Sequence, residues 1–187
     1  MRFQKFLEMR DRNFQYLQSL VPSWPPYVVQ DFIYKGFKNK PDKAKQWLQY
    51  LATNNGFGTA NEMQWQLTTV HITFDVFDQN TKIMLQERIE EEKARQQGIQ
   101  TPDQGNIGGG AVKNQQRMNT QADLLKKQPS QEPIIVVQHP QGLRLEEGWH
   151  RTVVTLINLP QGYNQKAYVL NASRAYDEPN DNWGQDA

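Results

Sequence analysis

The residues with the most chemical potential lie in one short turn, in which Glu147, Gly148, Trp149, His150 and Arg151 follow one another. A glycine between a strand and a helix leaves backbone amides at the start of the helix free to bind an anion. An arginine in the first helical turn adds a guanidinium that can hold phosphate through two parallel hydrogen bonds. The turn therefore predicts a phosphate site.

The side chains of this turn have different predicted roles. The predicted phosphate- or nucleotide-binding residues are Gly148, Trp149, His150, Arg151 and Thr152. Trp149 would stack on a base. Glu147 and His150 are the predicted catalytic groups: Glu147 would hold a divalent cation such as Mg²⁺ or orient an attacking water, and His150 would move a proton. The alternative is an arginine paired with a local carboxylate beside a core tryptophan.

Two further groups of side chains are candidates for binding. His71 and Asp75 share the polar face of a predicted strand, so they could join Glu147 around a divalent cation; ordinary surface residues are the alternative. A lysine-rich stretch beside Tyr34 and Trp47 has the residue types of a nucleic-acid surface, although a solvated helix connection gives the same pattern. Its lysines are Lys35, Lys38, Lys40, Lys43 and Lys45.

The elements that position these residues follow from hydrophobic spacing and from proline and glycine. Apolar residues at helical spacing predict amphipathic helices at 2–20, from about 23 to Gly36, and from Pro41 to about 54. Alternating residues from Gln66 predict a strand, and a helix is expected from about Thr81.

The second half of the sequence predicts a strand, turn, strand, helix and strand. The apolar run 133–137, the turn 139–142 and the segment 143–145 form the predicted hairpin. A helix over 149–159 and a strand over 166–170 follow. The glycine- and glutamine-rich stretch 98–118 has almost nothing to bury and predicts a flexible insertion, and 121–127 predicts a short helix.

Two motifs together resemble the ParB/sulfiredoxin-like superfamily. Residues 131–138, Gln-Glu-Pro-Ile-Ile-Val-Val-Gln, resemble the "QPI" strand of ParB-type domains. Residues 147–151, Glu-Gly-Trp-His-Arg, resemble the "GERR", "GGCHR" and "DGHHR" helix starts of ParB domains, sulfiredoxins and ParB-like nucleases. The resemblance covers mainly residues 119–171. It implies that Gly148, His150 and Arg151 take the phosphate-binding places and Glu147 the acidic one.

Departures from the family pattern limit what the resemblance implies. Trp149 stands where sulfiredoxins have their cysteine, and the sequence has no Cys, so sulfiredoxin chemistry is excluded. No third ParB motif and no helix-turn-helix domain follow, which argues against a partition clamp. The resemblance therefore favours a nucleotide or nucleic-acid (DNA) phosphate site, with a metal-dependent nuclease or nucleotide hydrolase as its enzymatic form.

Length and composition agree with one globular domain and appendages. The chain has 187 residues, a net charge of +1 and 11% aromatic residues, so a core is available and any polyanion site must be local. No apolar run or leader predicts a membrane span or secretion, and we expect a cytoplasmic protein.

The predicted class is α+β: a helical N-terminal region over 1–60, a ParB/sulfiredoxin-like domain with a small mixed sheet over 61–172, and an acidic tail over 173–187. The predicted function is nucleotide or nucleic-acid binding. The alternative is a non-catalytic interaction or structural protein, of the kind found as phage or mobile-element accessory proteins, that keeps the fold alone. Its N-terminal helices could then bind a protein partner.

Overall fold

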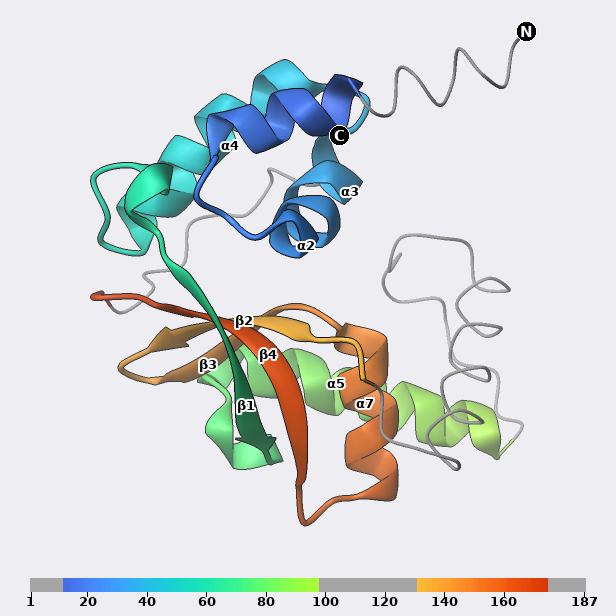
Figure 1. The fold of residues 1–187 in the computed structure, drawn as a ribbon. Helices are drawn as coiled ribbons and strands as arrows, with labels where there is room; N and C mark the ends of the chain where they lie inside the picture. Colours follow the sequence, from blue (N-terminus) through green and yellow to red (C-terminus); the bar gives the residue numbers. More distant parts are fainter. Residues whose placement is uncertain (1–11, 98–130, 175–187) are drawn as a thin grey trace, which may run out of the picture. The chain divides into compact units, whose positions relative to one another are not determined.

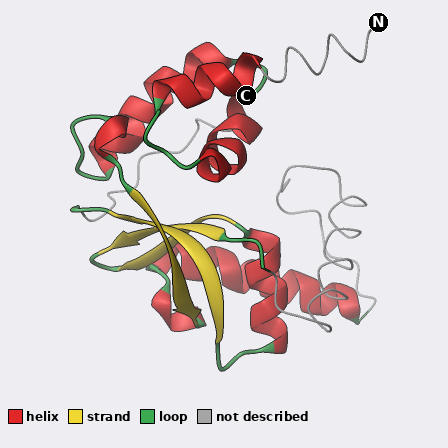
Figure 2. Ribbon diagram, viewed as in Figure 1, coloured by secondary structure: helices red, strands yellow, loops and turns green. Residues whose placement is uncertain are grey.

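The computed structural model describes residues 12–97 and 131–174 of the chain. It contains helices, several of them N-terminal, and a four-stranded sheet, so the predicted α+β class is confirmed (Figure 1, Figure 2). The predicted insertion at 98–118, the short helix at 121–127 and most of the acidic tail at 173–187 lie outside the described residues. No helix within 12–97 or 131–174 is long and apolar enough to cross a membrane.

The chain forms two compact units. The first consists of residues 1–67, 137–140 and 168–187, and the second of residues 68–136 and 141–167. The strand order in the sheet is β1-β4-β2-β3. The strands are β1 (Trp65–Ile72), β2 (Ile134–His139), β3 (Gly142–Glu147) and β4 (Tyr163–Asn171). The beginnings and ends of β1, β2 and β4 therefore belong to different units.

The first unit contains the predicted N-terminal helices. Residues 12–20 are helical, and the second predicted helix runs through α2 (Pro26–Val28), a π-helical segment η1 (Val29–Tyr34) and α3 (Lys35–Phe37). The third predicted helix is α4 (Pro41–Asn54). Both α2 and α4 begin on a proline, which suits a first helical position because the missing amide hydrogen would have no partner there. A short η2 (Ala60–Glu62) precedes β1.

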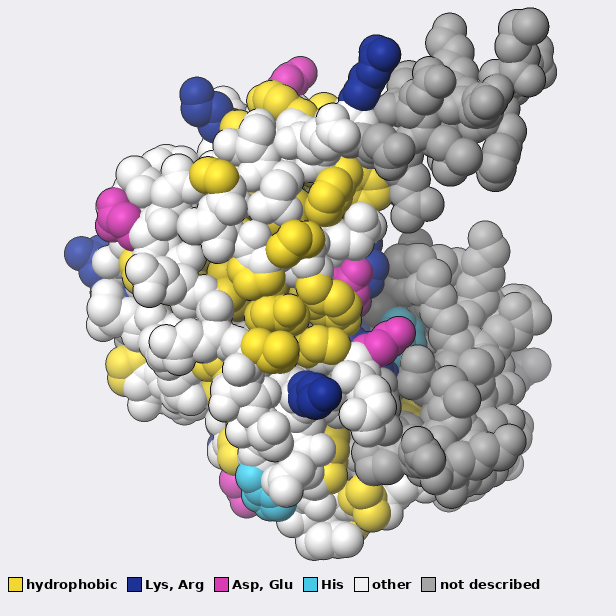
Figure 3. All heavy atoms as spheres, viewed as in Figure 1, with side chains coloured by type: hydrophobic (Ala, Val, Ile, Leu, Met, Phe, Trp, Pro, Cys, Tyr) yellow, Lys and Arg dark blue, Asp and Glu magenta, His cyan; other side chains and the backbone are white. Residues whose placement is uncertain are grey.

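Aromatic side chains build the core of the first unit. Trp24 is 2% exposed, and its ring meets that of Trp65 edge-on with centroids 5.3 Å apart. The Trp24 Nε1–H donates to the carbonyl of Ala60 at 2.9 Å, which satisfies the one polar group that its burial removes from water. Phe32 contacts both Trp24 and Trp47. Hydrophobic side chains also gather on the surface over α2 (Figure 3).

The second unit contains η3 (Phe74–Val76), α5 (Gln79–Gln96), the β2–β3 hairpin and α7 (Trp149–Asn158). The Asp78 carboxylate accepts the Thr81 amide at 2.8 Å and caps the start of α5. Helix α5 contacts both α7 and β3 (Figure 1). Ile134, Ile135 and Val136 are fully buried in β2, as the apolar run predicts. The turn glycine Gly142 has φ +133°, and a Cβ there would lie 2.9 Å from the Val76 carbonyl oxygen.

The strand predicted from Gln66 forms as β1, but few of its side chains are buried. Val70, Ile72 and Phe74 alternate with polar residues in the sequence. In the structure Ile72 is buried, Val70 is half-buried, and Phe74 lies beyond the strand in η3. The reason is that β1 is at the edge of the sheet, where most of its side chains remain exposed, including Leu67 at 56%.

Candidate phosphate-binding turn

Gly148 joins β3 to α7 through a backbone conformation that other residues rarely adopt. Its φ is +101° and ψ is 16°, so the chain turns from strand to helix within one residue. A Cβ at this position would lie 2.5 Å from Cγ2 of Ile134 and 3.4 Å from Nη2 of Arg151. Glycine is therefore required by both backbone and packing, and the Arg151 guanidinium lies next to the turn. The sequence predicted that these two residues act together.

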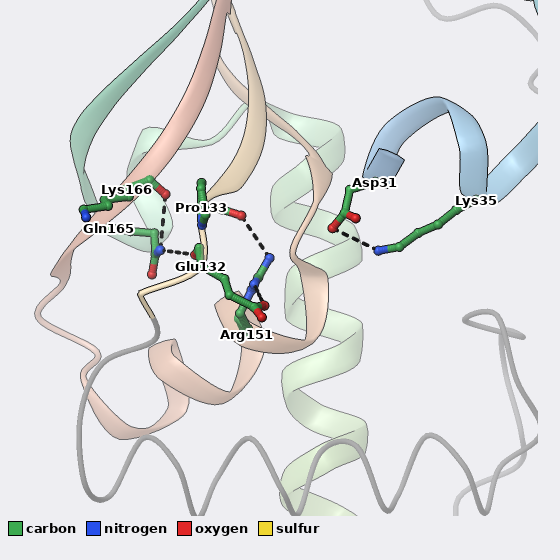
Figure 4. Close-up of polar contacts among 7 residues, drawn as sticks. All are labelled: Asp31, Lys35, Glu132, Pro133, Arg151, Gln165 and Lys166. Atoms are coloured by element: carbon green, nitrogen blue, oxygen red, sulfur yellow. Dashed lines mark hydrogen bonds and ion pairs between the residues drawn. The ribbon is translucent and has the colours of Figure 1, made fainter. Parts of the chain in front are cut away.

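Arg151 is buried in the first turn of α7, and its guanidinium has two hydrogen-bond partners. The residue is 7% exposed. Nη1 pairs with the carboxylate of Glu132, and Nη2 donates to the carbonyl of Pro133 at 3.0 Å (Figure 4). Within the described residues Nε is buried without a hydrogen-bond partner. The guanidinium is thus held in place by its two terminal nitrogens, while its Nε–H has no partner among the described residues.

Glu132 lies in the segment before β2, and its carboxylate pairs with Arg151. Its side chain is 72% exposed although its partner is 8% exposed. The Glu132 backbone is held separately, because its carbonyl accepts from Nε2 of the buried Gln165 at 2.8 Å. The carboxylate and the backbone of Glu132 are therefore held by different partners. An exposed carboxylate on a buried arginine is the arrangement that a phosphate oxygen could replace.

Trp149 is half-buried, and a cation lies on its ring. The Arg88 Cζ, from α5, is 4.9 Å from the centroid of the Trp149 ring, a cation–π distance. Partial burial lowers the pKa of Arg88, and Glu91 and Glu87 oppose that shift; the group stays charged at neutral pH. The predicted stacking of Trp149 on a base would use the ring face opposite Arg88.

Thr152 faces the interior rather than the surface of the turn. It is fully buried, and its amide donates to the Gly148 carbonyl at 3.0 Å as part of the helix. Its hydroxyl lies near Tyr163, a buried residue of β4. Burial raises the pKa of Tyr163, while the hydroxyls of Thr152 and Thr155 and the charge of Arg151 act in the opposite direction. Thr152 therefore belongs to the buried contact between α7 and β4.

The two predicted catalytic groups flank Gly148. Glu147 ends β3 and His150 is in the first turn of α7, and both are half-buried. The structure does not bring His71, Asp75 and Glu147 together as a metal-binding group, because the described residues contain no cluster of three His, Cys, Asp or Glu side chains that could hold a metal ion. His71 instead interacts through Nδ1 with Oδ1 of Asn164 at 3.0 Å. His71 lies on β1, which pairs with β4 at one edge of the sheet, whereas Glu147 ends β3 at the other edge.

The predicted lysine surface lies in the first unit, at α3, the start of α4 and the turn between them. All five of its lysines are exposed, and Lys35 pairs with Asp31 at 3.2 Å (Figure 4). These lysines and the Gly148 turn belong to different units.

Two contacts at the candidate site were not predicted. Glu132 was part of the motif at 131–138, but its pairing with Arg151 links residues 19 positions apart. Arg88 lies 61 positions before Trp149 in the sequence. Neither separation has a helical or strand period, so a single sequence carries no signal for these pairs.

No protein-family model matches the chain, and neither a curated protein nor a solved structure matches it.

Proposed function

We propose that this protein binds a phosphate group of a nucleotide or nucleic acid at the turn formed by Glu147, Gly148, Trp149, His150 and Arg151. One observation carries the proposal: the buried Arg151 guanidinium, beside a glycine at the start of α7, holds an exposed carboxylate rather than a buried one. The carboxylate of Glu132 occupies the position that a phosphate oxygen would take.

The energetics favour exchange of Glu132 for phosphate. Water competes with Arg151 for the exposed carboxylate of Glu132, so this ion pair is weaker than one buried on both sides. A phosphate has more negative charge and more acceptor oxygens than a carboxylate, so it can also reach donors that Glu132 leaves unused. The helix N-terminus at Trp149 adds a favourable field for an anion, because α7 is ten residues long.

Within this proposal the chain is a divergent member of the ParB/sulfiredoxin-like superfamily, supported by the motif residues at 131–138 and 147–151. A nuclease or nucleotide hydrolase is its enzymatic extension. Glu147 would then hold Mg²⁺ or another divalent cation, or orient a water, and His150 would move a proton. A cytoplasmic location belongs to the same proposal.

A second candidate function rests on the burial of the same residues. Arg151 is 7% exposed and Trp149 is covered by Arg88. Both observations are consistent with a structural role, in which the turn stabilises the packing of β2, α5 and α7. The protein would then be a non-catalytic interaction or accessory protein of phage or mobile-element type, and its N-terminal helices would supply the partner surface.

A thermal-shift titration separates the two candidates. Inorganic phosphate and the nucleoside triphosphates are added to the full chain with and without Mg²⁺. A ligand that binds the native state alone raises stability by RT ln(1 + [L]/Kd), which is about 2.7 kcal/mol at 100 times Kd. We expect stabilisation by at least one phosphate compound. Released phosphate or nucleotide product in the same samples would report hydrolysis.

The matched variants are Arg151→Lys and Arg144→Lys. Lysine keeps the charge of Arg151 but loses the planar fork, so the phosphate-induced stabilisation should fall by at least half. The Arg144 side chain is 13% exposed and pairs with Glu146 at 2.5 Å on β3. Arg144→Lys therefore controls for the loss of an arginine–carboxylate pair away from the Gly148 turn. Equal ligand responses in the two variants, or no response in the wild type, would favour the accessory protein.

A further inference from the structure

The segment from α3 through the start of α4 concentrates positive charge on the first unit. Five lysines occur within eleven residues, against one acidic residue, Asp42, and all five side chains are exposed. They are Lys35, Lys38, Lys40, Lys43 and Lys45. Lys and Arg side chains stand out on the helices of this unit in Figure 3. The chain as a whole has a net charge of +1, so this stretch is a local excess.

The backbone of this turn is held in place by hydrogen bonds. The Lys38 amide donates to Tyr34 at 2.9 Å, and the Lys38 carbonyl accepts from Nδ2 of Asn13 at 2.8 Å. The Lys40 amide donates to Phe37 at 3.0 Å. The lysine side chains therefore extend from a fixed backbone, which lowers the entropy lost when they bind a ligand.

Among the described residues, three of the five lysines have no anionic partner. Lys35 pairs with Asp31, and Lys40 also interacts with another residue, so neither is counted as unpaired. Within residues 12–97 and 131–174, no ion pair or side-chain hydrogen bond involves Lys38, Lys43 or Lys45. These three residues, called here the lysine turn, supply cations that a ligand can bind without displacing another group.

Half-buried aromatic rings lie among these lysines. The Phe37 and Trp47 rings have centroids 5.3 Å apart, and Phe32 meets Trp47 edge-on at 5.2 Å. Phe37 and Trp47 are both of intermediate exposure, so part of each ring is open to solvent. Cations that follow a backbone, combined with aromatic faces that accept bases, are the features by which proteins bind single strands.

We propose that the lysine turn binds the phosphate backbone of single-stranded nucleic acid, and that Phe37 or Trp47 contacts a base. The aromatic rings decide between possible polyanions, because an acidic peptide or a closed duplex presents no unstacked base to them. This site is separate from the Gly148 turn and does not depend on the function proposed there.

Fluorescence anisotropy with a labelled oligonucleotide of about 20 nucleotides tests the proposal, since a strand of that length spans a typical single-strand site. The full chain is titrated at several salt concentrations. In the variant Lys38→Gln/Lys43→Gln/Lys45→Gln the magnitude of the log–log salt slope should fall by about 2, because each single-strand phosphate contact contributes about 0.7. We expect Kd at low salt to rise about tenfold or more.

The control variant is Lys82→Gln/Lys93→Gln/Lys166→Gln. It removes the same charge from the second unit, so its salt slope should match that of the wild type. Phe37→Leu should weaken strand binding while leaving the salt slope unchanged, because it removes an aromatic face but no charge.

Three results would overturn the proposal: equal losses in the two triple variants, tighter binding of a duplex of the same length, or no binding of the strand at low salt. Nucleotide titrations of Arg151→Lys report on the Gly148 turn. A negative result in those titrations therefore does not change the interpretation of the lysine variants.

Discussion

At the scale of single residues, the Gly148 position combines two requirements that usually occur apart. Its φ of +101° favours glycine, and its packing against Ile134 leaves no room for a methyl group. An added Cβ would also lie 3.4 Å from Arg151 Nη2, which is an ordinary contact distance. The backbone conformation and Ile134 therefore set the requirement for glycine, and the guanidinium lies beside the turn.

We expect Gly148→Ala to destabilise the protein by about 2 kcal/mol or more. Alanine is strained at this positive φ, and its methyl group would overlap Ile134. Urea unfolding measures the change. Gly36→Ala is the matched control: nothing lies within 4 Å of its added Cβ and Gly36 lies inside α3, so that variant should gain about 0.5 to 1 kcal/mol. A Gly148→Ala protein as stable as the wild type would refute this view of the turn.

The sequence predicts the local part of the candidate site and misses the rest. A glycine followed by Trp149, His150 and Arg151 is visible in one dimension, and the structure places these residues at a strand-to-helix turn as expected. The partners of Arg151 and Trp149 are Glu132 and Arg88, which tertiary packing brings in. Whether an arginine is free or paired depends on such contacts, and residue type does not encode them.

At the scale of elements, α7 and β4 pack through a buried group of hydroxyls. Tyr163 is 7% exposed, Thr155 is 3% exposed and Thr152 is fully buried. Burial is the largest influence on Tyr163 and raises the pKa of its phenol above the ordinary 10.0. The folded protein therefore holds the Tyr163 proton more tightly than the unfolded chain does.

This difference predicts a loss of stability in alkali. Below pH 10.0 Tyr163 is protonated in both states, so its contribution to stability is complete. As pH rises further the unfolded chain releases this proton before the folded protein does, and the free energy of unfolding falls. We expect Tyr163→Phe to lose less stability between about pH 9 and pH 11 than the wild type.

Urea unfolding at the two pH values gives the comparison. Tyr16→Phe serves as its control, because the Tyr16 side chain is 38% exposed and keeps much of its hydration on folding. If Tyr163→Phe and the wild type lost the same stability in alkali, burial of the phenol would not be the cause.

Hydrophobic period and turn residues predict most of the elements. The helix from Pro41, the β2–β3 hairpin and the helix at Trp149 all occur where the pattern places them. The burial of β1 could not be predicted, because alternation shows that a strand has two faces but not whether its neighbours cover them. At the edge of the sheet they do not, and Leu67 remains 56% exposed.

At the scale of the whole molecule, two candidate anion sites lie in different units. The lysine turn belongs to the first unit and the Gly148 turn to the second. They differ in chemistry as well. The lysine turn offers exposed point charges that have no ion-pair partner among the described residues, whereas Arg151 is a buried planar group that already holds a carboxylate. Salt should therefore weaken binding at the lysine turn more strongly than binding at Arg151.

Phosphate binding at the Gly148 turn requires Glu132 to act as an exchangeable anion. Glu132→Gln removes the competing charge but keeps the size of the side chain and its backbone bond to Gln165. Glu146→Gln removes one carboxylate from an internal arginine pair of the same unit and is the control.

The most direct measurement is an affinity titration of inorganic phosphate and the nucleoside triphosphates against the wild type and these two variants. We predict that Glu132→Gln binds about two- to fivefold more tightly than the wild type, because the water-exposed carboxylate of Glu132 no longer competes with the ligand for Arg151. Glu146→Gln should bind as the wild type does. Unchanged or weaker binding by Glu132→Gln would contradict the account and leave Arg151 with a structural role.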